Sequence, residues 1–550
     1  MSWDGAGGYR EGCSSFGGYH PFQATFRYLW FQCGWHGSFD VNFLYLAQGG
    51  LGLPDRSYNL EQGNAKFAAI RLRYLAYIAS MLRLAGFDNA DARSKGIFAL
   101  ETKMAEVHWS KAEFRQPDRQ GCNLKLEDLS KTYPGFDWAE LAAAVRVQKQ
   151  KSLYVSAPSA IAGISKLLAS EPLDVWKDHL AFHTLKMAAP FLPKAFVEEN
   201  FVFLGTVLTG QLEIQPRWMR GVHRTTEALG DAIGKVYVAN YFPPEAKQQA
   251  DQMIKNIIAA MDQRLADLTW MDPSTKTRAR SKLASLTFKI GYPSTWRDYS
   301  GLEVRRGDAL GNALRVAEFG FQQKIDKLDS LIDPELWHMT PMMVDAYAWI
   351  SPNGNEMVFP AGILQPPYYD PNADPAVNYG GIGAVIGHEI SHHFDNKGRK
   401  IDEAGYPLNW WTVDDSMRFK ALSERVVKQY AAFEPLPGIH VDGELTLGEN
   451  IADLAGLNIA YDAYHRSLKG KAAEVLEGFT GDQRFFLSFA QIWCWKSCEQ
   501  ALLRQVATDP HTPQQLRPNV VRNLDAWYEA FGVKAGQSQF LAPEDRIKFW

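Results

Sequence analysis

The sequence predicts a mainly α protein of the α+β class, with long helices in both halves and one small β-hairpin. Apolar residues recur at helical spacing between residues 59 and 86 and again between residues 254 and 268. Between residues 345 and 364 the pattern changes to two short strand-like runs on either side of a Pro-Asn-Gly turn, which is typical of a hairpin. We therefore expect a mostly helical N-terminal half and a mixed, mostly helical C-terminal half.

Two further helices are predicted in the C-terminal half. One covers residues 382–395, IGAVIGHEISHHFD, after a loop rich in Pro and Tyr and a pair of glycines. The other covers residues 447–468, LGENIADLAGLNIAYDAYHRSL, and changes from polar to apolar along its length. Residues 1–42 are rich in Gly and aromatic side chains without any steady period, so they predict irregular structure or sequence foreign to the fold.

The composition is that of an ordinary globular protein, large enough for more than one domain. The 550 residues include 46% apolar and 22% charged residues, with a net charge of -4 and no long basic run, which argues against a nucleic-acid-binding protein. No segment has the roughly 20 apolar residues that a membrane span requires, and the first residues contain no apolar signal core. We expect a soluble chain, cytoplasmic as written, or periplasmic or secreted if the native N-terminus is missing.

The five cysteines are too few and too scattered for a disulfide scaffold. Cys494 and Cys498 lie four residues apart, which places them on one face if the segment is helical. No second pair completes a metal site, so we expect both to be core thiols.

The most informative motif is HEISH, residues 388–392. On a helix, His388 and His392 lie on the same face, so both imidazoles can bind one cation, and Glu389 lies close enough to touch a metal-bound water. Two imidazoles, one carboxylate and an open fourth position suit zinc, which lowers the pKa of the water while the glutamate takes its proton. The alternative interpretation is a surface helix with two solvated histidines.

The third ligand has to come from elsewhere in the chain. Asp395 and Gly398 stand where one known pattern has a glycine and a third histidine, and Trp411 stands where another pattern has a glutamate. A downstream helical glutamate remains, and Glu449 in GENIAD, 57 residues past the second histidine (449 − 392), is the candidate. Asp453 shares the helix face of Glu449 and, like Asp395, could hydrogen-bond a ligand histidine. A solvated helix face is the other interpretation of Glu449 and Asp453.

Several blocks together resemble the family of neprilysin and endothelin-converting enzyme. They are MVFPAGILQPPYYD, NYGGIGAVIGHEISHHFDNKGR, a Trp-Trp pair and GENIADLAGL, supported by ETKMAEVHW, KIGYP and FAQIWC. The resemblance extends over residues 43–550 and implies a two-lobed fold, with a thermolysin-like zinc catalytic domain that contains a small sheet and a helical N-terminal lobe. The implied division is an unassigned segment at 1–42, an incomplete helical lobe at 43–300, a connecting segment at 301–344 and the catalytic domain at 345–550.

The resemblance also implies roles for the residues of the two C-terminal motifs. His388, His392 and Glu449 would hold one zinc ion per chain, and Glu389 would be the general base. Asp453 matches an aspartate that orients a ligand histidine and is also described as a proton donor in the family. These roles agree with those that the residue types suggest on their own.

The remaining implied residues bind the substrate. In DPHTPQQLR, His511 matches a histidine that stabilises the transition state, and Arg517 matches an arginine that binds a substrate carbonyl. Asp345 and Ala346 match the edge-strand motif that pairs with the peptide backbone. The pocket for the residue after the scissile bond would be formed by apolar and aromatic side chains, for which core packing is the alternative role: Ile363, Tyr368, Val385, Ile492 and Trp493.

Three features depart from the family pattern, and one of them is the segment AYAWISPNGNE after Asp345, which is two residues longer than the usual turn. Asp345 replaces an asparagine, and a carboxylate cannot donate a hydrogen bond to a substrate carbonyl. Residues 1–42 do not resemble the family, and we expect a long N-terminal segment of the helical lobe to be missing. Ile547 stands where animal members have a disulfide cysteine, which indicates a bacterial-type member.

The predicted function is that of a zinc-dependent metalloendopeptidase that cuts peptides on the N-terminal side of hydrophobic residues. The alternative is a truncated, catalytically impaired relative that only binds zinc or peptides. Peptide substrates are the expected partners, and the sequence predicts no oligomeric state.

Overall fold

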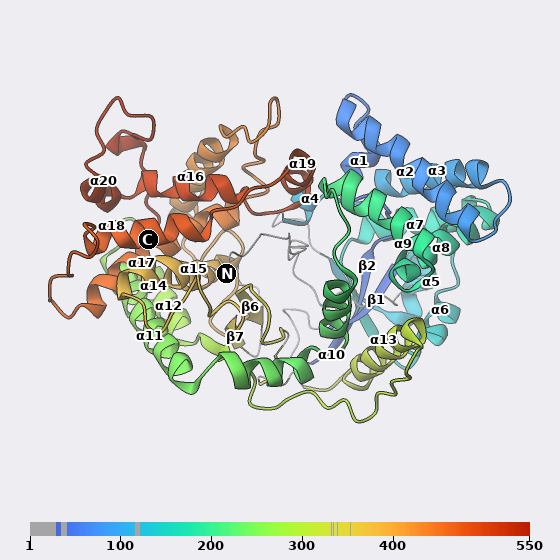
Figure 1. Cartoon of the computed structure of the whole chain (residues 1–550), viewed down its shortest axis with the longest axis horizontal. Coiled ribbons are helices and arrows are strands. Elements are labelled where there is room, and N and C mark those ends of the chain that lie inside the picture. Colours follow the sequence, from blue (N-terminus) through green and yellow to red (C-terminus); the bar gives the residue numbers. More distant parts are fainter. Residues whose placement is uncertain are drawn as a thin grey trace.

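The computed structural model is mainly α, as predicted, and its helices form two lobes that face each other (Figure 1). The lobe that contains most of the C-terminal half, called the catalytic lobe below after the domain expected there, lies on the left of the view, and the N-terminal helices lie on the right. The structure describes residues 29–34, 41–115, 121–331, 333, 335–337, 339–351, 354–406 and 408–550.

The N-terminal lobe contains a small mixed sheet with the strand order β1-β2-β4-β3. β1 pairs antiparallel with β2, β2 pairs parallel with β4, and β4 pairs antiparallel with β3. The prediction of irregular structure before residue 43 is therefore wrong for the residues of β1, whose backbone pairs with a strand of the lobe. The strands are β1 (Leu29–Gly34), β2 (Phe43–Gln48), β3 (Cys122–Lys125) and β4 (Ser152–Val155).

Helices surround this sheet and supply two apolar cores to the N-terminal lobe. The helix predicted between residues 59 and 86 is confirmed by α2, which begins after Asn64, whose side chain accepts hydrogen bonds from the backbone of Lys66 and Phe67. The helices are α1 (Arg56–Leu60), α2 (Ala65–Leu84), α3 (Ala90–Val107), α4 (Lys111–Arg115), α5 (Leu129–Thr132), α6 (Trp138–Ala144), α7 (Pro158–Ser170), α8 (Leu173–Ala188), α9 (Lys194–Phe201) and α13 (Ala309–Asp326).

The catalytic lobe contains the predicted hairpin and most of the remaining helices. β6 (Tyr347–Ser351) pairs antiparallel with β7 (Gly354–Pro360), and β5 (Thr287–Gly291) adds a parallel strand on the other side of β7. Two residues of the predicted turn, Pro352 and Asn353, lie outside the described residues. The helices are α11 (Pro244–Asp267), α12 (Pro273–Ala284), α14 (Pro375–Asn378), α15 (Ala384–His392), α16 (Val413–Ala431), α17 (Leu447–Ser467), α18 (Gly481–Ile492), α19 (Glu499–Thr508) and α20 (Asp525–Phe531).

Seven short helical turns complete the described structure. Two of them bear on the site: η5 is a π-helical turn before α15, and η7 is a 3-10 segment after α19. The turns are η2 (Leu126–Asp128), η3 (Ala189–Phe191), η4 (Val202–Val207), η5 (Tyr379–Gly383), η6 (Gly398–Lys400), η7 (Gln514–Asn523) and η8 (Pro543–Asp545).

The division between the lobes differs from the expected boundary at residue 300. Apolar side chains of α11, α12 and β5 pack into one core with residues 357–550, so this part of the chain belongs to the catalytic lobe. α13, which lies in the expected connecting segment, packs instead against the N-terminal lobe, where Ile325 contacts its core. The chain therefore passes between the lobes more than once, a path that a linear division of the sequence does not represent.

Two helices connect the lobes. α10 (Arg217–Tyr241) bends at Leu229, whose φ of -128° and ψ of 35° are not helical. Gly230 and Gly234 let α10 pack closely on the returning chain, because a Cβ at these positions would lie 2.4 Å from Thr340 Cγ2 and 2.8 Å from Pro341 Cδ.

α19 belongs in sequence to the catalytic half but contacts the N-terminal lobe. Leu503 is buried in one of that lobe's cores, and Lys66 Nζ lies 2.5 Å from Glu499 Oε1. Cys498, just before α19, donates through Sγ to the carbonyl of Thr209 at 2.7 Å. The prediction of core thiols is wrong, since Cys494 and Cys498 are both exposed and lie between α18 and α19 rather than on one helix.

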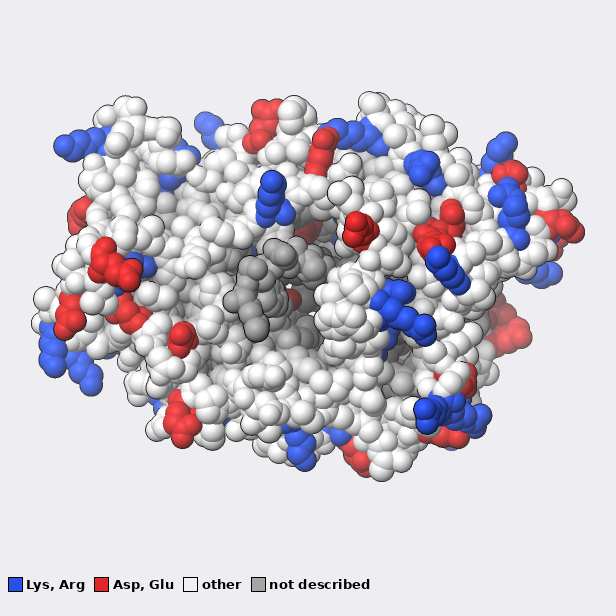
Figure 2. All heavy atoms as spheres, in the orientation of Figure 1, with Lys and Arg blue, Asp and Glu red and all other residues white. Residues whose placement is uncertain are grey.

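Charged side chains of both signs share the visible surface. Figure 2 shows Lys and Arg interspersed with Asp and Glu over the visible face, which is hollowed at its centre between the lobes. Among the described residues, no helix combines the length and the apolar character that crossing a bilayer would require.

Candidate metal centre and active site

The site is built where α15 crosses α17 at two glycines. A Cβ on Gly456 would lie 2.3 Å from the backbone nitrogen of His388, and a Cβ on Gly387 would lie 2.5 Å from the carbonyl oxygen of Gly456. Only glycine permits this approach of two helix backbones. Because the crossing is so close, side chains from the first turns of α17 reach the histidines of α15.

Two histidines of α15 and one glutamate of α17 direct their ligand atoms toward one point. His388 Nε2 lies 3.0 Å from His392 Nε2, and Glu449 Oε2 lies 3.4 Å and 3.1 Å from these two nitrogens. Ligands bound to zinc at about 2.0–2.1 Å in a tetrahedron are separated by roughly 3.3 Å. The three residues therefore fit a zinc ion, and they are one of the groups of the described chain whose ligand atoms are close enough to hold a metal.

A carboxylate is hydrogen-bonded to Nδ1, the second ring nitrogen, of each of the two histidines. His388 Nδ1 lies 2.8 Å from Asp453 Oδ1, and His392 Nδ1 lies 2.8 Å from Asp395 Oδ2. With Nδ1–H donated to a carboxylate, each ring presents the Nε2 lone pair to the metal position. Both aspartates predicted to orient ligand histidines occupy that position.

Asp453 also pairs with Arg517. Arg517 Nε donates to Asp453 Oδ2 at 2.7 Å, and the guanidinium lies over the ring of Trp493, with Cζ 3.7 Å from the ring centroid. Burial raises the pKa of Asp453, but Arg517 and the hydrogen bond with His388 outweigh it and hold this pKa well below its usual value. The aspartate is therefore ionised and shared between a ligand histidine and the arginine.

Glu389 follows His388 on α15 and is buried, with 8% of its surface exposed. His388 and Glu449 are buried nearby, while the side chain of His392 keeps 18% of its surface accessible. A carboxylate at this position is largely shielded from bulk water.

His511 lies on the other side of Glu449. Its Nε2 is 3.2 Å from Glu449 Oε2, and its Nδ1 is 2.8 Å from Asp509 Oδ1, which also accepts from the backbone N–H of His511. Thr512 Oγ1 donates to Asn450 Oδ1 at 2.7 Å, which ties this loop to α17. Burial lowers the pKa of His511, but the carboxylates of Glu449 and Asp509 outweigh it and raise the pKa to about 10.

The predicted substrate-binding residues lie in the same lobe. Asp345 and Ala346 directly precede β6, which is one of the two outer strands of the β5-β7-β6 sheet. Ile363, Ile492 and Trp493 are buried in the core of the catalytic lobe, and Tyr368 and Val385 pack against that core while partly exposed. Trp493 also contacts Arg517, so it is the pocket candidate that the described contacts connect directly to the site.

Sequence reasoning missed two residues that shape the site. Asp509 positions His511, and its only sequence signal is an aspartate two residues before a histidine. Lys282 of α12 is fully buried and donates to the carbonyls of His393, Gly398 and Ile401 at 2.8, 2.8 and 2.7 Å. Burial lowers the pKa of Lys282 to about 7. No sequence signal distinguishes this lysine, because a lysine on an amphipathic helix is usually solvated.

Comparison with known families agrees with this geometry. The model of the N-terminal part of peptidase family M13 matches residues 23–293, and the model of peptidase family M13 matches residues 347–547. The first match begins within the segment that the sequence left unassigned. An endothelin-converting enzyme homolog from Locusta migratoria is 32% identical over 534 residues, which cover 92% of this chain and 72% of the relative.

Solved structures show the same fold. The zinc metalloprotease Zmp1 of Mycobacterium tuberculosis in complex with an inhibitor is 39% identical and aligns with a TM-score of 0.91, covering 95% of this chain and 80% of that chain. The open state of the same enzyme covers 95% and 82% but gives a TM-score of 0.69. The two lobes of this chain are therefore arranged more like those of the inhibitor complex than those of the open state. With both halves matched, the chain belongs to peptidase family M13 and is a peptidase.

Proposed function

We propose that this peptidase is a zinc-dependent endopeptidase that cuts peptides on the N-terminal side of hydrophobic residues. The observation that carries the proposal is the convergence of His388 Nε2, His392 Nε2 and Glu449 Oε2 at separations of 3.0–3.4 Å, with the other nitrogen of each ring bound to a carboxylate. The same residues are the ones that the family resemblance implies as ligands.

The chemistry follows from what surrounds these ligands. Bound zinc would supply a Lewis acid that polarises the scissile carbonyl and lowers the pKa of a water. Glu389, one residue after His388, accepts the proton of the attacking water and delivers it to the leaving amine. Its burial keeps that proton from exchanging freely with the solvent.

His511 and Arg517 stabilise the charge that develops on the substrate. The carboxylates of Glu449 and Asp509 raise the pKa of His511, which favours the protonated imidazole that can donate to a substrate carbonyl. An imidazolium donor beside the carbonyl oxygen binds the transition state more tightly than the ground state. Arg517 donates to Asp453 through both Nε and Nη2, which fixes the guanidinium plane, and Nη1 is the group that would contact a peptide carbonyl.

Specificity is expected from the hairpin and the apolar side chains near it. The outer strand β6 offers main-chain groups for strand addition by an extended peptide. Ile363, Tyr368, Val385, Ile492 and Trp493 would then line the pocket for the residue after the cut. One methylene in such a pocket changes binding by only about 1–3 kcal/mol, so selectivity is broad rather than strict.

The test combines a peptide library with a variant of the general base. We expect wild-type cuts, mapped by mass spectrometry, to fall mainly before Phe, Leu, Ile and similar residues. Glu389→Gln keeps its zinc but loses about 10²–10⁴-fold in kcat, because the base is gone. The matched control Glu424→Gln changes an exposed glutamate of α16 and keeps full turnover.

Two results would overturn the proposal. Substantial turnover by Glu389→Gln would mean that another group is the base. Cuts mainly before Asp, Glu or Lys would refute the apolar pocket while leaving the zinc chemistry in place.

A further inference from the structure

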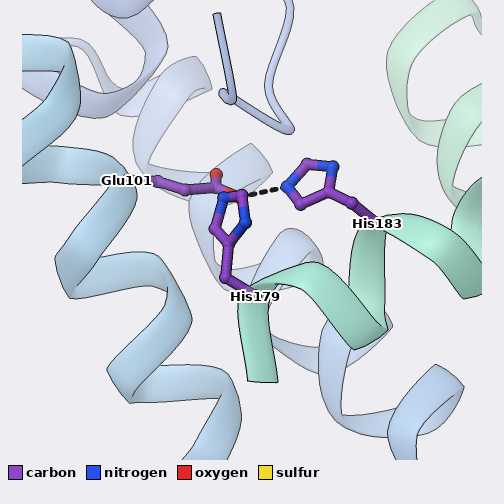
Figure 3. Close-up of side chains that lie close together, drawn as sticks. All are labelled: Glu101, His179 and His183. Carbon is purple, nitrogen blue, oxygen red and sulfur yellow. Dashed lines mark hydrogen bonds and ion pairs between the residues drawn. The ribbon is translucent and has the colours of Figure 1, made fainter. Parts of the chain in front are cut away.

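A second cluster of metal-ligand residue types lies inside the N-terminal lobe. His179 and His183 are four residues apart on α8, and both rings point toward Glu101 on α3 (Figure 3). His183 Nε2 lies 2.9 Å from Glu101 Oε1, and His179 Nε2 lies 3.4 Å from the same oxygen. The three side chains are 0–1% exposed.

The two distances from Glu101 Oε1 are close to those of the other centre, where the three ligand atoms lie 3.0–3.4 Å apart, and all three ligand atoms of this cluster lie within 4.8 Å of one another. The two groups also share one donor set and one arrangement, with a His-x-x-x-His pair on one helix and a glutamate on another. The centroids of the two rings are 4.1 Å apart here and 4.6 Å apart at the catalytic centre. The geometry thus fits a cation of the same size.

The backbone of the segment before α1 closes the remaining side of the cluster. The carbonyl oxygen of Gly50 lies 2.9 Å from His179 Nε2, which is again a ligand-to-ligand separation. The N–H of Gly52 and the hydroxyl of Tyr74 donate to Glu101 at 2.9–3.1 Å. A Cβ on Gly52 would lie 1.7 Å from Tyr74 Oη, so this backbone rests directly on the cluster.

A cluster held by hydrogen bonds between neutral groups would give similar distances. The charge of Glu101 therefore decides between such a cluster and a metal site. Its side chain has no solvent exposure, and among the described residues its ion pairs are with His179 and His183 only. A buried carboxylate needs a compensating positive charge. A divalent cation on the three ligand atoms supplies it while leaving both imidazoles neutral, which is the form that binds metal.

We propose that Glu101, His179 and His183 bind one divalent transition metal ion, with the carbonyl of Gly50 as fourth donor. The mixed nitrogen and oxygen set suits zinc. Four protein donors leave no position for water, so the site is structural rather than hydrolytic, and it joins α3, α8 and the segment around Gly50. This site does not depend on the function proposed above.

The first experiment counts metal in the full-length chain purified with zinc and passed over a chelating resin. Mass spectrometry of the metal should give two zinc ions per wild-type chain, one for His392→Ala, one for His179→Phe and none for the double variant. His223→Phe, which changes an exposed histidine of α10, serves as the matched control and keeps both ions. His179→Phe should retain wild-type kcat with the zinc of the catalytic centre in place.

The second experiment leaves the three proposed ligand side chains unaltered. His392→Ala, whose catalytic centre is disabled, is refolded with Co²⁺ as the probe, and its visible absorption is recorded. A four-coordinate ion gives intense bands, and Tyr74→Phe in the same background should weaken Co²⁺ affinity about 10–100-fold by removing a hydrogen bond to the ligand carboxylate. The proposal would be overturned if the wild-type chain held one zinc ion and His392→Ala held none. It would also be overturned if His392→Ala gave no Co²⁺ bands. Either result would mean that protons alone hold the cluster together.

Discussion

The two His-x-x-x-His segments of this chain can be compared directly. Residues 388–392 lie on α15 and meet Glu449 of α17, while residues 179–183 lie on α8 and meet Glu101 of α3. Both place two imidazoles and one carboxylate at ligand-to-ligand distances. The donor set alone therefore does not determine which segment is catalytic.

The difference lies in the residues around the donors. The residue after the first histidine is Glu389 in the catalytic lobe and Leu180 in the N-terminal lobe, so only the former segment has a carboxylate for the role of general base proposed above. Side chains of the catalytic centre keep some exposure, 18% for His392 and 31% for His511, whereas the other cluster is closed. A hydrolytic site needs an open position as well as ligands, and a structural site does not.

Exchanging each glutamate for glutamine should give the largest contrast between the clusters. We expect Glu449→Gln to lower kcat/KM at least about a hundredfold, since losing a ligand costs no less than losing a residue that orients one. Glu101→Gln should leave kcat/KM nearly unchanged but reduce the free energy of unfolding by at least about 2 kcal/mol, because it removes a ligand of the structural metal and weakens buried hydrogen bonds to a charged group. Steady-state kinetics and urea unfolding of both variants check this, and the opposite pattern would mean that the roles are assigned the wrong way round.

The carboxylates behind the catalytic histidines should have a smaller effect. Asp453→Asn removes the charge that holds His388 and Arg517, so zinc affinity or kcat/KM should fall about 10–100-fold. Chelator competition measures the first quantity and peptide turnover the second. The control is Asp482→Asn, which changes an aspartate of α18 that pairs with His465, away from the ligands. Equal effects of the two substitutions would argue against a specific role for Asp453.

The smallest effect is expected at the helix crossing. Gly456→Ala places a methyl group against the backbone of His388, so we expect a loss of about 2 kcal/mol in the free energy of unfolding. Gly221→Ala on α10, where a Cβ would meet nothing within 4 Å, should instead stabilise by up to about 1 kcal/mol. Thermal unfolding of the two variants distinguishes a close crossing from a general cost of replacing glycine.

Local patterns predicted the elements that carry the site. α2, α11, α15, α17 and the hairpin of β6 and β7 follow from helical or alternating spacing, and the pair of histidines four residues apart needs only the periodicity of a helix. The sheet of the N-terminal lobe and the parallel strand β5 were not predicted. Their strands have only four to six residues, and their partners are distant, as in the pairing of Tyr45 with Tyr154.

Tertiary contacts explain what the sequence could not predict about the site. Glu449 reaches the histidines only through the crossing at Gly387 and Gly456. From spacing alone, Glu449 could therefore be either a ligand or part of a solvated helix face. The family resemblance decided between these two roles. Asp509 and Lys282 act through contacts that depend on folding. The path of the chain between the lobes likewise depends on long-range packing, which no local pattern encodes.

The most direct test of the central claim is an anomalous difference map at the zinc absorption edge from crystals of the full-length protein. We predict a peak between His388, His392 and Glu449, beside Glu389, and a second peak between Glu101, His179 and His183. The first peak without the second would keep the catalytic centre and remove the structural site. No peak at His388, His392 and Glu449 in a chain that cleaves peptides would contradict the account.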